Sequence, residues 1–184
     1  MATTQSNMTA DDLWRLPEDH LRHELIRGQL TTMPLNSGEH GEIAMNVGVA
    51  LSQHVRSRGL GAVLAGGCGF ILARNPDTVR TSDISFISKE RIAAGGIGIP
   101  EGFVPYAPDI AVEIVSHDES QVEIQERIEQ WLQAGAAIVW VVNPRGRTVT
   151  VHRSGRDPRI LRENDVLDGE DVCPGFSVRV AEFL

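Results

Sequence analysis

One carboxylate stands inside an apolar run. Residues 108–116 read Pro-Asp-Ile-Ala-Val-Glu-Ile-Val-Ser, which is typical of a strand buried on both faces, and Glu113 lies in its centre. An unpaired carboxylate is costly to bury, so an acid at such a position is normally paired, protonated or bound to a cation. Asp109 shares a face with Glu113, but the strand between them places the two about 13 Å apart. A cation held by Glu113 therefore needs its second ligand from another segment.

Asp83 is the best candidate for that second ligand. It lies near the start of residues 82–87, a run that predicts another strand, and strands that follow one another along a chain tend to pair. One carboxylate from each of two strands about 4.8 Å apart could flank a divalent cation. Hard oxygen ligands suit Mg²⁺ or Mn²⁺, which complete their shell with water and substrate phosphates. Because such a metal polarises a phosphoryl oxygen and activates water, the two acids predict phosphodiester hydrolysis.

The elements that must position these acids follow a mixed α/β pattern. Residues 24–34 predict a hairpin around a turn at Arg27-Gly28, and apolar residues at every fourth position predict a helix from residue 36 or 37 to about 58. A second helix is expected over about 119–134 and a glycine-rich loop over 92–107. Further strands are expected at 62–65, 69–73, 82–87, 108–115, 138–142, 148–153, 160–161 and 177–180. We therefore expect an α/β fold in which helices flank a mixed sheet, with residues 1–8 as a flexible tail and 9–184 as a single domain.

Composition and charge exclude several classes of protein. The 184 residues are 41% hydrophobic and 23% charged, which is typical of globular proteins, and the longest apolar run is no longer than a strand. Cys68 and Cys173 stand alone, so we expect no disulfide, no zinc–cysteine site and a cytoplasmic location. The net charge of −8 weighs against a strong non-specific nucleic-acid binder. The sequence also lacks the usual signatures of serine hydrolases, phosphate-binding loops, zinc proteases and dinucleotide-binding folds.

The chain places an acid on one strand, a second acid inside the next strand and then a helix. This order of elements resembles that of the PD-(D/E)XK nuclease superfamily. Within it, the chain resembles the bacterial Uma family of restriction-type endonucleases. No single matching segment is specific, but the ordered set is, and it extends over nearly the whole chain. The segments are 24–30, the start of the long helix with His40, 82–87, 108–116, 131–144 and 168–176.

This resemblance implies a restriction endonuclease-like fold, with β-hairpins towards both ends of the chain, and an Mg²⁺- or Mn²⁺-dependent enzyme that cuts DNA. It implies that Asp83 and Glu113 bind the metal and that Glu24 is a further catalytic carboxylate. The superfamily's catalytic lysine is replaced: its usual position holds Val115, and the Uma-type position on the following helix holds Arg127. Arginine can hold a scissile phosphate, but it stays protonated and cannot act as a general base. Restriction-type enzymes commonly pair to cut both strands, so a homodimer is expected.

The sequence leaves several roles open. His40 is a candidate substrate contact or simply an exposed residue at a helix start. Arg145 and Arg147 belong to six arginines over 145–162 that face either a phosphate backbone or solvent. Glu113 has two structural alternatives, a place at an exposed edge or an ion pair with an arginine. The missing lysine and the acidic net charge favour an alternative function, a catalytically inactive nuclease-fold domain that binds nucleic acid or protein. Hydrolysis of a small phosphoester is a third, weaker alternative.

Overall fold

A six-stranded sheet forms the centre of the molecule in the computed structural model, which describes residues 7–17, 19, 21–117 and 119–184. The parallel pair β7–β8 is connected by helix α4, the crossover that parallel neighbours require, and the other neighbours run antiparallel. The strand order is β10 (Arg159–Arg162), β9 (Thr148–His152), β8 (Ile138–Asn143), β7 (Ile110–Ile114), β6 (Ile84–Ser88) and β3 (Gly61–Ala65).

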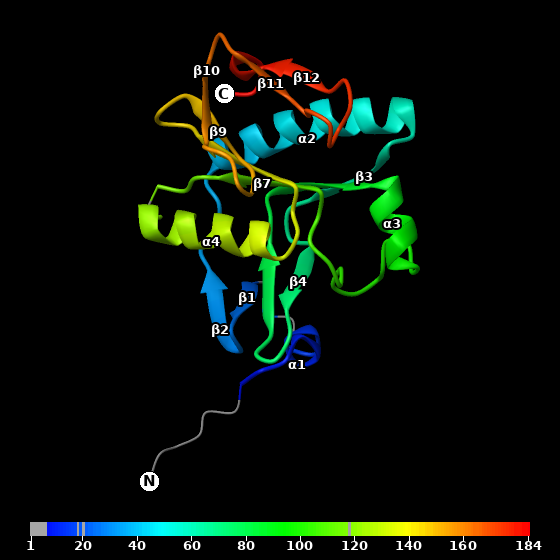
Figure 1. The fold of residues 1–184 in the computed structure, drawn as a ribbon. Coiled ribbons are helices and arrows are strands. Elements are labelled where there is room, and N and C mark those ends of the chain that lie inside the picture. Colours follow the sequence, from blue (N-terminus) through cyan, green and yellow to red (C-terminus); the bar gives the residue numbers. More distant parts are fainter. Residues whose placement is uncertain (1–6, 18, 20, 118) are drawn as a thin grey trace.

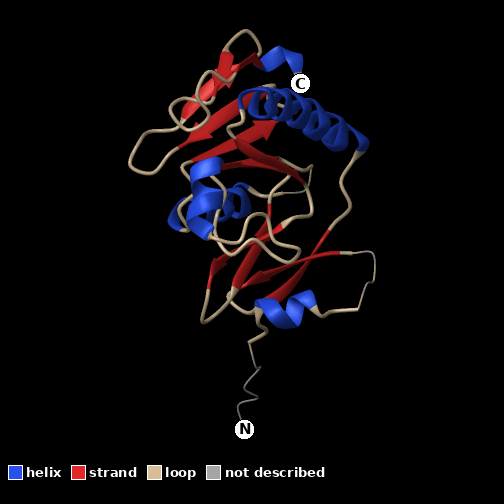
Figure 2. Cartoon of the chain, turned by 90° about the vertical axis from the view of Figure 1, so that its right-hand side faces the viewer, coloured by secondary structure: helices blue, strands red, loops and turns tan. Residues whose placement is uncertain are grey.

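Two helices cover opposite faces of this sheet (Figures 1 and 2). Helix α2 (Gly38–Arg58) starts at the N-cap Ser37 and ends at Gly59, whose positive φ of 62° suits glycine. Its buried residues Ile43, Val47, Leu51 and Val55 pack on one face of the sheet. Helix α4 (Gln121–Gln133) starts in a capping box at Ser120 and packs on the other face through Ile124, Ile128 and Trp131.

A second, four-stranded sheet lies beside the first, in the order β2 (Gln29–Met33), β1 (Arg22–Ile26), β5 (Thr78–Thr81) and β4 (Gly69–Ala73). Helix α1 (Ala10–Trp14) packs against it through Ala10 and Leu13. The chain leaves this sheet at the end of β5 and enters the six-stranded sheet at β6. Asp83 therefore lies at the junction of the two sheets.

The remaining elements are α3 (Lys89–Gly95), the hairpin β11 (Val166–Asp168) and β12 (Ser177–Arg179), and the short 3₁₀ helix η1 (Val180–Glu182). This C-terminal part of the chain adds Leu167, Val180 and Phe183 to the hydrophobic core that contains the buried residues of α2. No helix of the described residues has the length and apolar character needed to cross a membrane.

The mixed α/β architecture, both long helices and most strands agree with the sequence predictions, but three details differ. Strands β5 and β11 were not expected, and the loop predicted from residue 92 is helical up to Gly95. Residues 1–6 of the predicted tail lie outside the described residues, whereas the Met8 amide donates to the Gly28 carbonyl at 2.9 Å.

Candidate active site

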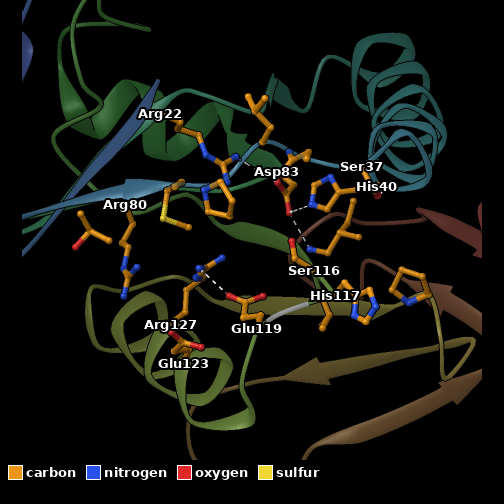
Figure 3. A pocket seen from close by; sticks show the side chains of 18 of the residues that line it. Arg22, Ser37, His40, Arg80, Asp83, Ser116, His117, Glu119, Glu123 and Arg127 are labelled. Atoms are coloured by element: carbon orange, nitrogen blue, oxygen red, sulfur yellow. Dashed lines mark hydrogen bonds and ion pairs between the residues drawn. The ribbon is translucent and has the colours of Figure 1, made fainter. Parts of the chain in front are cut away.

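A cleft of about 680 Å³ opens where the two sheets meet (Figure 3). The β1–β2 hairpin, the start of α2, the end of β7, the start of α4 and the turn after β8 contribute to its walls. The lining has mixed charge, because arginine and histidine side chains alternate there with carboxylates. The basic side chains are Arg22, His40, Arg80, His117, Arg127 and Arg145, and the acidic ones are Glu39, Asp83, Glu119, Glu123 and Glu126.

Asp83 immediately precedes β6, and Glu113 lies near the end of the neighbouring strand β7. Strands β6 and β7 pair antiparallel from Ile84 opposite Val112, and the ladder is irregular at Asp83, whose amide donates to the Val112 carbonyl at 3.0 Å. The Ile114 amide donates to Asp83 Oδ2 at 2.8 Å. Asp83 lines the cleft, whereas Glu113 does not line it. The pairing of β6 with β7 places the two acids near enough for the charge of Asp83 to raise the pKa of Glu113.

Asp83 is contacted by two cationic side chains from outside its own sheet. His40 Nε2 lies 3.2 Å from Asp83 Oδ2, and Arg22 Nη1 lies 3.8 Å from Oδ1. Burial alone would lower the pKa of His40, but its hydrogen bond to Asp83 and the charge of that acid outweigh burial and raise it. Capping by Ser37, whose hydroxyl accepts from the His40 amide at 3.2 Å, fixes the helix start that presents this histidine.

Glu113 is buried and bound by two donors from α4. Arg127 Nη1 donates to Glu113 Oε2 at 2.9 Å, and Trp131 Nε1 donates to Oε1 at 2.7 Å. The two donors are four residues apart and therefore project from one face of the helix. Burial raises the pKa of Glu113 to about 7; Arg127 opposes this rise, while the charges of Asp83 and Glu24 add to it. Three carboxylates thus lie close enough to repel one another.

Arg127 links this acid to the cleft. Its Nη2 lies 2.8 Å from Glu119 Oε1 (Figure 3). Because its Nη1 contacts Glu113, the guanidinium spans the two acids. Burial opposes the charged form, but these two acids outweigh it and raise the pKa of Arg127. Arg127 is therefore a permanent cation at the wall of the cleft.

Glu24 lies behind the cleft wall. It is 0% exposed, and its Oε1 accepts from the amide and the hydroxyl of Thr81, both at 2.8 Å. Its Oε2 accepts from Arg80 Nη1 at 2.7 Å, and Arg80 Nε reaches Gln130 Oε1 at 2.7 Å. This chain of contacts connects β1, β5 and α4, and so it fixes the four-stranded sheet against the helix that carries Arg127.

Comparison with known proteins identifies the family and the fold. The family model Uma2, described as a putative restriction endonuclease, matches residues 10–181. The chain belongs to the Uma2 family. A crystal structure of a putative nuclease belonging to DUF820 from Anabaena variabilis superimposes with a TM-score of 0.80 at 22% identity, covering 96% of this chain and 97% of that one. The nuclease-like fold is thereby shown. No curated protein matches the chain.

In this Uma2 protein, several residues that line the cleft carry a buried polar atom without a hydrogen-bond partner. Among the described residues there are seven such side-chain atoms, and three of them, Arg22 Nε, His40 Nδ1 and Arg127 Nε, belong to the cleft lining. A fourth, Ser82 Oγ, belongs to the residue before Asp83. Buried polar groups normally have partners, so these atoms are candidates to bind water or a ligand.

The donor set can be tested against a divalent metal. Within the described part of the chain, no three His, Cys, Asp or Glu side chains are grouped to hold a metal. Mg²⁺ needs fewer, because one or two carboxylates suffice when water and substrate phosphates complete the shell. The charge of Asp83 adds to the effect of burial in raising the pKa of Glu113, and a cation between the two acids would oppose both effects. Both oxygens of each acid already face protein donors, however: Arg22, His40 and the Ile114 amide at Asp83, and Arg127 and Trp131 at Glu113. A metal ion would therefore have to displace some of these donors.

The other candidate residues separate into two groups. His40 and Arg145 line the cleft, and Arg145 contacts His117 there. Arg147 does not line the cleft: its Nε lies 2.5 Å from Glu163 Oε1, and its Nη2 donates to the Leu184 carbonyl at 3.2 Å. Its contacts are those of a surface ion pair.

Three residues of this Uma2 site were missed from the sequence. Arg22 precedes Glu24 by two positions and so shares its strand face, a signal that was available. Trp131 follows Arg127 by one helical turn, and it is both buried in the core and a donor to Glu113. Arg80 carried no signal, because β5 itself was not expected.

Proposed function

We propose that this protein is an Mg²⁺- or Mn²⁺-dependent endonuclease that hydrolyses DNA phosphodiester bonds as restriction endonucleases do. The observation that carries the proposal is that the pairing of β6 with β7 brings Asp83 and Glu113 near enough for their charges to interact, with Asp83 at a cleft that has arginine on several walls. Membership of the Uma2 family and the nuclease-like fold support it.

In this proposal, Asp83 and Glu113 would hold the metal, and the bound metal would supply charge for the phosphoryl oxygen and a more acidic attacking water. Arg127 exchanges its contact with Glu113 for a nonbridging oxygen of the scissile phosphate, and Arg22, which lines the same cleft, binds a neighbouring phosphate. Arg127 remains protonated throughout, so it contributes charge and orientation and accepts no proton.

The remaining residues position or extend the site. Glu24 holds Arg80 and Thr81 and keeps β1, β5 and α4 in register, so we assign it a positioning role. His40 orients Asp83 and, together with Arg145, faces the substrate in the cleft. The two unpaired cysteines suit a reducing cytoplasm. A homodimer follows from the need to cut both strands of a duplex.

The second candidate function is a catalytically inactive nuclease-fold domain that binds nucleic acid. A specific observation favours it: each of the three acids already accepts hydrogen bonds from protein donors, and arginine stands where a lysine would assist the water. Calorimetric titration with Mn²⁺ separates the two functions, since an inactive domain of this kind would show no saturable binding that depends on Glu113.

Cleavage of plasmid and oligonucleotide DNA tests the first candidate. We expect divalent-dependent nicking by the wild-type chain and its loss in Glu113→Gln and Asp83→Asn. Asp109→Asn is the matched control, because Asp109 is also a buried acid bound by a helix arginine but lies away from the cleft. Equal activity in the wild type and Glu113→Gln would exclude the assignment.

A further inference from the structure

Helix α2 presents a regular stripe to solvent. Its buried residues occupy one side of the helix, and the opposite side carries Glu42, Met45, Val49, Gln53 and Arg56, all exposed. Met45 is 64% exposed and Val49 is 44% exposed, so the centre of the stripe is apolar. Steps of three and four residues keep the five side chains on one helix face. Both Figures 1 and 2 show α2 at the periphery of the molecule.

The stripe is symmetric about Val49. Its members are spaced three, four, four and three residues apart, so an antiparallel copy of α2 would place Val49 opposite Val49, Met45 opposite Gln53 and Glu42 opposite Arg56. The two ends are oppositely charged. Among the described residues, neither Glu42 nor Arg56 has an ion-pair partner within the chain, and they are about 21 Å apart along the axis. The helix face is therefore complementary in charge to a second copy of itself.

We propose that two copies of this chain associate through the α2 stripe, antiparallel about a twofold axis at Val49. Such an interface is isologous, so each favourable contact away from the axis occurs twice. The two Glu42–Arg56 pairs flank an apolar centre of Met45 and Val49. A single helix face is smaller than a standard interface, so the dimer is weak and reversible.

The arrangement fixes where the two clefts lie. His40 lines the cleft near the start of α2, and in the antiparallel pair the two His40 residues are about 27 Å apart along the axes. The clefts consequently lie towards opposite ends of the helix pair. This proposal goes beyond the catalytic one, because it concerns how two copies meet and holds whether or not the cleft cleaves DNA.

Charge exchange tests the pairing. Sedimentation equilibrium of the full chain, at concentrations on the order of 10 to 500 µM, measures the dimer dissociation constant. We expect Glu42→Arg and Arg56→Glu each to weaken association about tenfold or more, because each replaces two attractions by two repulsions. The double variant restores association, and an equimolar mixture of the two single variants forms a heterodimer. Val122→Arg, at an exposed valine of α4, is the control that leaves association unchanged.

Crosslinking tests the register separately. In a Cys68→Ser background, Val49→Cys is expected to form a disulfide-linked dimer under mild oxidation, because each Val49 faces its own symmetry mate. Met45→Cys faces Gln53 and is expected not to crosslink. A wild-type chain that stays monomeric over the whole concentration range, single variants that associate as the wild type does, or equal crosslinking at both positions would overturn the proposal. Thermal melts of all variants establish that each is folded.

Discussion

Asp109 and Glu113 lie at opposite ends of β7 on the same face, and each is bound by an arginine from a helix. At the Asp109 end, Arg91 Nε lies 2.8 Å from Oδ1 and the Ser88 amide donates to Oδ2 at 2.6 Å. The same guanidinium donates to the carbonyls of Ala107 and Gly135. These contacts hold α3 against the start of β7 and against the segments that contain Ala107 and Gly135.

The Glu113 end differs in its neighbours. Asp83 and Glu24 lie near enough to raise the pKa of Glu113, whereas Asp109 contacts Arg91 and the Ser88 amide. Arg127 extends to the cleft wall and leaves its Nε without an acceptor. An acid–arginine pair therefore does not by itself distinguish a structural contact from a functional site, and variants at the two ends of β7 test the difference.

The largest expected effect is the loss of DNA cleavage on substitution of Glu113. Glu113→Gln keeps the size of the side chain but removes a metal-binding charge, so we expect DNA cleavage to fall on the order of 10³-fold. The free energy of unfolding should also fall, by more than for a partly exposed pair, because Arg127 and Trp131 lose a charged acceptor at a buried position. Cleavage rates with Mg²⁺ and Mn²⁺ and a urea unfolding curve measure both quantities. A variant that loses stability but keeps its activity would make Glu113 purely structural.

For Asp109→Asn we expect a loss of stability without a loss of cleavage. This change leaves Arg91 without its carboxylate partner, and we expect a loss of about 2 kcal/mol in the free energy of unfolding, less than for a fully buried pair because Arg91 is partly exposed. Cleavage per folded molecule should remain that of the wild type. Urea unfolding provides the first measurement and the plasmid assay the second. If Asp109→Asn abolished cleavage, the two ends of β7 would not be functionally distinct.

Divalent cations should stabilise the fold only through the Glu113 end. At ten times the dissociation constant, Mn²⁺ binding to the folded chain adds about 1.4 kcal/mol to the free energy of unfolding. We expect this gain, seen as a rise in Tm, for the wild type and Asp109→Asn, and no gain for Glu113→Gln. A Tm rise of equal size in all three chains would place the bound ion elsewhere.

The sequence predicts those helices and strands that are stabilised by features of the local sequence, such as apolar periodicity and capping residues. Helix α2 has its apolar stripe and its caps at Ser37 and Gly59, and β7 is an apolar run. Strand β5 (Thr-Val-Arg-Thr) has no such pattern, because it is held by pairing with β1 and β4 and by the contacts of Arg80. Pairing between segments distant in sequence decides that strand, and local propensity does not.

The same distinction divides the candidate site. Asp83 and Glu113 could be identified because each acid interrupts an apolar or aromatic run, and their strands are adjacent in the sheet. Arg22 reaches Asp83 only because the four-stranded sheet lies beside the six-stranded one. The partners of a buried charge depend on how sheets pack, which residue spacing along one strand does not encode. Arg127 became a candidate through the resemblance to a family. Its contacts with Glu113 and Glu119 could be identified only from the structure.

The smallest expected effect concerns the two arginines. Arg127→Lys places a group beside Glu113 that can release a proton, which arginine cannot, so we expect cleavage to accelerate about tenfold. Arg91→Lys makes the same replacement at the Asp109 end, where no cleft lies, and should leave the cleavage rate unchanged. Single-turnover rates against pH distinguish proton transfer from phosphate binding, because only a titrating amine adds a new inflection. A slower Arg127→Lys enzyme with an unaltered pH profile would mean that the site depends on the two-pronged hydrogen bonding of the Arg127 guanidinium and not on proton transfer.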